Sequence, residues 1–155
     1  MINQILVAVD GSPFSLRAAR LGAKILSQNP SGVLTLLYIA KHQSDLDWFQ
    51  GPGSRVKEAP GKERQAMETA FDKGQEILKE AASACQDLLK EGTIRVETLV
   101  VPGEPAQKII ETALQKHCEL IVMGSRGAGR LKGVFLGSVS QKVLAQGQLP
   151  VLIVK

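Results

Sequence analysis

Short apolar runs that alternate with helical patterns constrain the fold of this 155-residue chain more than any other feature. Four runs, at residues 2–9, 33–39, 120–123 and 151–154, are short and apolar, which is typical of strands buried on both faces of a sheet. A fifth strand is predicted from Thr93 to Val101. Polar and apolar residues alternate there, so we expect a position nearer the edge of the sheet.

The stretches between the predicted strands have the features of helices. Ser12 can cap a first helix that starts at Pro13 and ends near Ser27. Apolar residues at helical spacing predict a longer helix over residues 62–90, a third that opens at Glu104 and a short fourth from Ser138 to about residue 147.

This order of elements predicts one α/β domain spanning residues 1–155. Five strands that alternate with four helices form a parallel sheet with helices on both faces. The polar stretch at about residues 41–60 contains several glycines and prolines, and we interpret it as a surface loop of that single domain.

Charge and hydropathy exclude several classes of protein. The net charge of +4 comes from 19 Lys and Arg against 15 Asp and Glu, and these basic residues form no cluster that would indicate a nucleic-acid interface. No apolar stretch approaches the ~20 residues that span a bilayer, and the first residues do not resemble a signal peptide. Cys85 and Cys118 lack metal-ligand spacing, which favours two free thiols. We therefore expect a cytoplasmic protein that binds neither nucleic acid nor membrane.

The glycine-rich segment from Gly124 to Gly137 is the strongest candidate for a functional site. It follows the fourth predicted strand, at the sheet edge where open α/β sheets bind ligands. Glycines allow backbone N–H groups to turn towards an anion, and Arg126, Arg130 and Lys132 lie among them. Ser138 and Gln141 have the spacing of a capping box at the start of the next helix.

Amides, a helix N-terminus and basic side chains together predict a polyphosphate site at this segment. The alternative is a flexible loop that only connects strand to helix.

Two common phosphate motifs do not match this segment. A Walker loop needs Lys and then Ser or Thr after its second glycine, but Arg130 and Leu131 follow Gly129. The dinucleotide-binding fingerprint would follow the first strand, where the chain has only the turn that begins at Asp10.

The segment does match the pattern G-x2-G-x9-G-[ST], through Gly124, Gly127, Gly137 and Ser138. In this respect the chain resembles the ATP-binding members of the universal stress protein family. The resemblance covers the whole chain, because residues 5–12, 36–39, 120–127 and 150–154 are similar to the other blocks of the family in the right order. It implies a Rossmann-like sandwich of the adenine nucleotide alpha hydrolase-like type, with strand order 3-2-1-4-5.

The resemblance also implies a binding site for ATP, with Mg²⁺ or Mn²⁺ beside the triphosphate. Asp10 would contact the ribose or, through that metal ion, the phosphates; alternatively it only caps the turn into the first helix. The residues implied for the adenine are Ala8, Val9 and Ile39, those bordering the ribose and phosphates are Met123, Gly124, Arg126 and Gly127, and those binding phosphate are Gly137, Ser138 and Val139.

These expectations lead to a nucleotide-dependent stress-response or regulatory module with slow or no turnover. No catalytic residue is identified, because no general base or catalytic triad is evident beside the glycine segment. The alternatives are a slow ATP-hydrolysing enzyme, a module for another adenine nucleotide such as cyclic AMP, and an interaction protein that binds no nucleotide. Family dimers pair through the last strand, which implies a homodimer through residues 151–154 unless the chain itself covers that strand.

Overall fold

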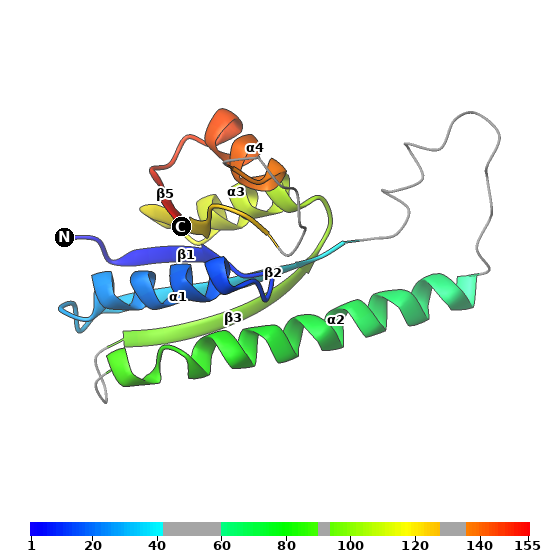
Figure 1. Cartoon of the computed structure of the whole chain (residues 1–155), viewed down its shortest axis with the longest axis horizontal. Coiled ribbons are helices and arrows are strands. Elements are labelled where there is room, and N and C mark those ends of the chain that lie inside the picture. The colour runs from blue at the N-terminus through cyan, green and yellow to red at the C-terminus, as the bar shows by residue number, and fades with distance from the viewer. Residues whose placement is uncertain (42–59, 90–93, 128–135) are drawn as a thin grey trace.

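The computed structural model describes residues 1–41, 60–89, 94–127 and 136–155. Residues 42–59 of the predicted surface loop, and Gly129, Arg130, Lys132 and Gly133 of the glycine segment, lie outside these ranges. Figure 1 shows the elements in chain order: β1 (Gln4–Ala8), α1 (Pro13–Leu26), β2 (Gly32–Ala40), α2 (Pro60–Ser83), a 3-10 turn (Gln86–Leu88), β3 (Ile94–Pro102), α3 (Pro105–Gln115), β4 (Leu120–Gly124), α4 (Ser138–Gln146) and β5 (Val151–Val154).

The five strands form one parallel sheet in the order β3-β2-β1-β4-β5. This confirms the predicted α/β fold and its strand order. Strand β1 lies at the centre, where Ala8 pairs with Leu37 of β2 on one side and with Met123 of β4 on the other. The carboxyl ends of these three strands therefore meet at one edge of the sheet, and β3 and β5 form its two sides.

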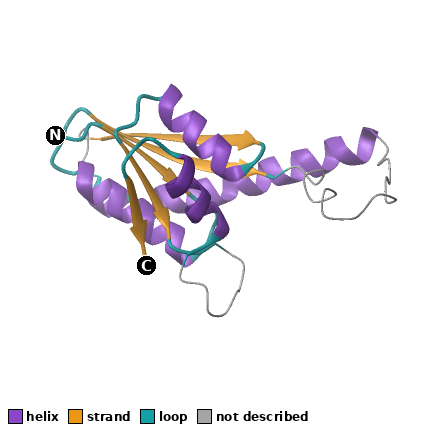
Figure 2. Ribbon diagram, turned by 90° about the horizontal axis from the view of Figure 1, so that it is seen from above, coloured by secondary structure: helices purple, strands orange, loops and turns teal. Residues whose placement is uncertain are grey.

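Helices cover both faces of the sheet (Figure 2). Ile5 and Val7 of β1 belong to the core beneath α1 and α2, whereas Leu6 belongs to the core beneath α3 and α4. All three side chains are completely buried. The strands have apolar residues on both faces because each face packs against a helical layer.

The start of α1 agrees with the prediction, and the end of α2 does not. The Ser12 hydroxyl caps α1 by accepting a hydrogen bond from the Ser15 amide at 3.1 Å. Helix α2 was expected to continue to residue 90 but ends at Ser83 and is followed by the 3-10 turn. Arg20 of α1 binds this turn, because its guanidinium donates to the Ala84 carbonyl and to both oxygens of Asp87.

The first half of α2 extends beyond the sheet (Figure 1). Phe71 is 39% exposed, whereas Leu78 and Ala81 further along the same helix are buried. The predicted apolar stripe therefore packs against the core only in the second half of the helix. The point at which α2 reaches the sheet lies close to the carboxyl ends of the strands.

Candidate functional site

A pocket of about 560 Å³ lies where the carboxyl ends of β1, β2 and β4 meet. Its size is within the ~300–1,000 Å³ range of small-molecule sites. The structure brings all of the site residues predicted from the sequence to this pocket: Ala8, Val9, Asp10, Ile39, Met123, Gly124, Arg126, Gly127, Gly137, Ser138 and Val139.

The first turn of α4 forms one wall of the pocket. Ser138 is the first residue of this helix and Gly137 is its N-cap, so the predicted capping box is wrong. The Gln141 side chain instead donates to the Leu136 carbonyl at 3.0 Å. Because Gly137 has no side chain to accept from the first amides of the helix, the positive end of α4 is presented to the pocket.

Hydrogen bonds hold this helix start against the end of β4. The Gly137 amide donates to the Ser125 carbonyl at 2.7 Å, and the Ser140 hydroxyl donates to the Gly124 carbonyl at 2.9 Å. The Ser125 amide donates a hydrogen bond to the Val154 carbonyl of β5 at 2.7 Å. The wall is therefore fixed to the sheet and is suited to bind an anion without rearrangement.

The three glycines of the motif differ in the space that surrounds them. A Cβ at Gly124 would lie 2.7 Å from the Phe14 Cβ, so this glycine allows α1 to approach β4. A Cβ at Gly127 would lie 2.8 Å from Oδ2 of Asp10. A Cβ at Gly137 would have no neighbour closer than 3.5 Å, so no contact among the described residues requires a glycine there.

Asp10 lies between the turn into α1 and the glycine segment. Its Oδ1 accepts a hydrogen bond from the Ser12 amide at 2.9 Å, and its own amide donates to the Ser15 hydroxyl at 3.3 Å. Gly11 has a φ of 84°, which only glycine adopts readily in such a turn. The carboxylate thus supports the turn, as the alternative interpretation held, and also lines the pocket beside Gly127.

The wall formed by β2, α3 and β4 is apolar. Ile39 and Met123 belong to the core beneath α3 and α4, together with Leu37 and Ile109. Leu37, Ile109 and Pro105 also line the pocket and were not predicted as site residues. Leu37 could have been found from the sequence, because residues two apart in a strand share a face and Ile39 was already assigned.

Helix α2 contributes a third wall that sequence reasoning missed. Tyr38, Lys41, Ala70 and Lys73 line the pocket on this side. The Tyr38 ring lies against Gly74, where an added Cβ would be 2.4 Å from the ring Cδ1. Burial, and to a smaller extent the Asp10 carboxylate, raises the pKa of the Tyr38 hydroxyl above its ordinary value.

The described part of the chain has no group of three His, Cys, Asp or Glu side chains that could hold a metal ion. Mg²⁺ is usually bound by one or two carboxylates together with phosphates, so Asp10 would suit an ion that arrives with a nucleotide.

Cys85 and Cys118 are buried free thiols, and burial raises the pKa of each to about 11. None of the described helices is long and apolar enough to span a membrane.

A parallel α/β sheet with a pocket at the carboxyl ends of its central strands belongs to the class of open α/β folds, which bind ligands at this edge. The chain belongs to the universal stress protein family, whose model matches residues 1–155. It is 32% identical over 155 residues to a universal stress protein of Thermus aquaticus, and 34% identical to universal stress protein YxiE of Bacillus subtilis. Both matches cover all of this chain and all of the relative.

Solved structures support the same fold. MJ0577 of Methanocaldococcus jannaschii superimposes with a TM-score of 0.80 at 21% identity, over 100% of this chain and 96% of that one. A universal stress protein in complex with cAMP gives a TM-score of 0.66 at 24% identity over 99% and 96% of the two chains. A family member from Arabidopsis thaliana with AMP bound gives 0.65 at 18% over 99% and 91%.

Proposed function

We propose that this protein binds an adenine nucleotide, with ATP as its ligand, and acts as a nucleotide-dependent stress-response or regulatory module. The observation that carries the proposal is the first turn of α4, which has no N-cap side chain and lines a pocket together with Gly127. Backbone amides and the positive end of a helix bind phosphate in many unrelated proteins. The apolar wall opposite this turn suits the face of a purine base.

The proposed arrangement of the nucleotide follows the order of the strands. The adenine lies against Ala8, Val9 and Ile39, and Asp10 accepts hydrogen bonds from the ribose hydroxyls. The phosphates lie against Gly127, Gly137 and Ser138, with Arg126 and Val139 beside them. A Mg²⁺ or Mn²⁺ ion would bind mainly to the phosphates and reach the protein through Asp10.

The ligands of related proteins support an adenine nucleotide. The solved structures similar in fold include complexes with cAMP and AMP, and one from Archaeoglobus fulgidus in complex with dAMP. Among the described residues that line the pocket, Asp10 is the one carboxylate, and its Oδ1 is already bound by the Ser12 amide. This supports a binding module with slow or no turnover over an efficient ATPase.

A binding experiment on paired serine variants tests this proposal. Calorimetry with ATP, AMP and cyclic AMP measures the affinity of the unmodified protein, which we expect to bind ATP. Ser138→Ala removes a hydroxyl from the phosphate wall and should lower the ATP affinity about threefold to tenfold. Ser31→Ala is the control, because Ser31 precedes β2 at the opposite edge of the sheet.

The absence of binding to any adenine nucleotide at millimolar concentration would contradict the proposed function. Mixing the protein with ATP and Mg²⁺ and measuring ADP release separates the two remaining cases. We expect release no faster than the background, and a steady release above it would establish the slow ATPase instead.

We further propose a homodimer that pairs through β5 in the cytoplasm. This strand forms one side of the sheet, and all four of its residues are partly exposed. An apolar edge strand with an open side is suited to pair with a second copy. Two buried free thiols are compatible with a reducing compartment.

A further inference from the structure

Two close contacts fix α2 beside the pocket. The Tyr38 ring of β2 lies directly against the backbone of Gly74, with no room for a Cβ between them. One turn further along the helix, Ile77 packs against Gly11, whose hypothetical Cβ would lie 3.2 Å from the Ile77 Cδ1. Because Gly11 directly follows Asp10, these contacts place the middle of α2 next to the predicted ribose position.

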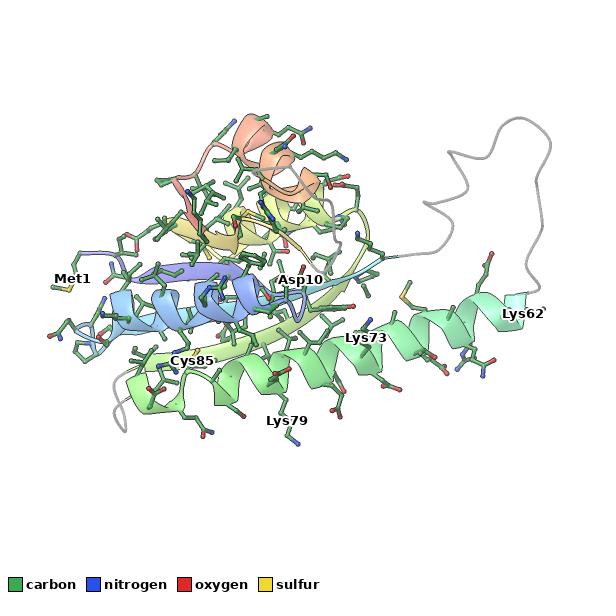
Figure 3. All side chains as sticks on the ribbon, in the orientation of Figure 1. Met1, Asp10, Lys62, Lys73, Lys79 and Cys85 are labelled. Carbon is green, nitrogen blue, oxygen red and sulfur yellow. The ribbon has the colours of Figure 1, made fainter. Side chains whose placement is uncertain are left out.

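Lys73 precedes Gly74 and belongs to the wall of the pocket. In Figure 3 its side chain rises from the side of α2 that faces the sheet, whereas Lys79 points away from the body of the protein. Lys41, the residue after β2, lines the same side of the pocket. Two ammonium groups therefore lie on the α2 side, both on exposed residues.

No ion pair within the described ranges involves either of these two lysines. An ammonium group at a pocket wall without a carboxylate partner favours an anionic ligand there. Tyr38 lines the same pocket, and its hydroxyl is a further hydrogen-bond donor. The wall therefore presents donors and positive charge to whatever fills this side of the pocket.

This basic wall is separate from the phosphate wall formed by α4. Lys41 follows β2, and Lys73 lies on α2 next to the contact between Gly74 and Tyr38 of β2. Gly124 and Gly127 lie at the end of β4, and β1 with Asp10 lies between β2 and β4. Two strand spacings amount to roughly 10 Å. A nucleotide whose phosphate binds the amides of α4 would thus leave the lysines to a different group.

We propose that Lys41 and Lys73 form a second anion-binding wall, which binds an additional phosphate group of the same nucleotide. The inference rests on the proposed adenine-nucleotide function and specifies its ligand class as nucleotides with more than one phosphate. The additional phosphate has two chemical sources. It is either the terminal phosphate of a 5′-polyphosphate chain whose first phosphates bind the start of α4, as in ATP, or a phosphate on the ribose, as in adenosine 3′,5′-bisphosphate.

Calorimetry with four ligands tests the proposal: adenosine, AMP, ATP and adenosine 3′,5′-bisphosphate. Lys73→Met and the Lys41→Met/Lys73→Met double variant remove the charges but keep apolar stems of similar length. We expect the double variant to bind adenosine as the unmodified protein does. It should lose about threefold to tenfold in affinity for at least one of the two ligands that carry additional phosphate.

The pattern of losses identifies the source of the phosphate. A loss confined to ATP assigns the wall to the 5′ chain, and a loss confined to the bisphosphate assigns it to a ribose phosphate. Lys79→Met on the outer side of the same helix is the matched control, and it should leave all four affinities unchanged.

Two results would overturn the proposal. One is an equal affinity of the double variant and the unmodified protein for all four ligands, and the other is an equal loss for adenosine and the phosphorylated ligands. In both cases the proposed function would still stand if the protein binds AMP and if Ser138→Ala lowers its affinity for AMP. A protein that binds none of the four ligands would remove both proposals together.

Discussion

At the scale of single residues, the glycine-rich segment contains glycines that packing requires and glycines that packing does not require. Gly124 is needed for packing, because a Cβ there would meet Phe14 of α1 at 2.7 Å. Gly137 has room for a Cβ in the described structure and adopts an extended N-cap conformation, with φ of −68° and ψ of 155°, that alanine can adopt. A phosphate in the space into which a Cβ would project would explain why this position is a glycine.

This difference predicts opposite effects for two alanine substitutions. Gly137→Ala should change the free energy of unfolding by less than about 1 kcal/mol, yet lower ATP affinity about tenfold. Gly124→Ala should cost about 1–3 kcal/mol of unfolding free energy, because α1 or β4 must shift. Urea denaturation and calorimetry on each variant provide the two measurements, and unchanged ATP affinity in Gly137→Ala would remove that glycine from the site.

At the scale of elements, the sequence predicted the strands and helix starts that neighbouring residues in the sequence determine. Short apolar runs identified the buried strands, and Ser12 followed by Pro13 identified the start of α1. The eleven predicted residues that line the pocket lie on β1, β2 and β4, on the loops that follow β1 and β4, and on the first turn of α4.

The missed features depend on contacts between distant parts of the chain. Helix α2 ends at Ser83, and Arg20, which is 64 residues away from Ala84 in the sequence, binds the turn that follows the helix. Lys73 lines the pocket next to Gly74, which packs against Tyr38 of β2. No pattern within α2 itself predicts that contact with β2. The capping box was predicted from spacing alone, but Gly137 and not Ser138 is the N-cap.

The contact between α2 and β2 gives a prediction for the helix as a whole. Gly74→Ala would bring a methyl group to 2.4 Å from the Tyr38 ring and force the helix away from the pocket. We expect a loss of about 1–3 kcal/mol in the free energy of unfolding, together with weaker nucleotide binding. Gly61→Ala in the exposed first turn is the control, since no atom lies within 4 Å of its Cβ, and thermal unfolding compares the two.

At the scale of the whole molecule, the open side of β5 determines how copies can associate. The Pro150 carbonyl accepts a hydrogen bond from the Ile121 amide of β4 at 3.0 Å, and the Val154 carbonyl accepts one from the Ser125 amide just after β4 at 2.7 Å. Backbone groups alternate in direction along a strand, so those of Val151 and Ile153 point to the open side. A second β5 strand could bind these groups without disturbing the sheet.

A substitution on the open side tests the proposed dimer. Ile153→Pro removes an outward N–H group, while the conservative Ile153→Val keeps it. We expect sedimentation analysis at micromolar concentration to show dimers for the unmodified protein and for Ile153→Val, and monomers for Ile153→Pro with an unchanged circular dichroism spectrum. An unmodified protein that sediments only as a monomer would contradict the proposal.

We propose that the first turn of α4 and the glycine-rich segment hold the phosphates of an adenine nucleotide. A crystal structure of the protein grown with excess ATP and Mg²⁺ tests it most directly. We expect electron density for phosphate within hydrogen-bonding distance of the Gly127, Ser138 and Val139 amides, and density for the adenine beside Ile39. A structure in which the nucleotide binds elsewhere would contradict the proposed site. A structure in which side chains of the protein itself accept hydrogen bonds from those amides would also contradict it.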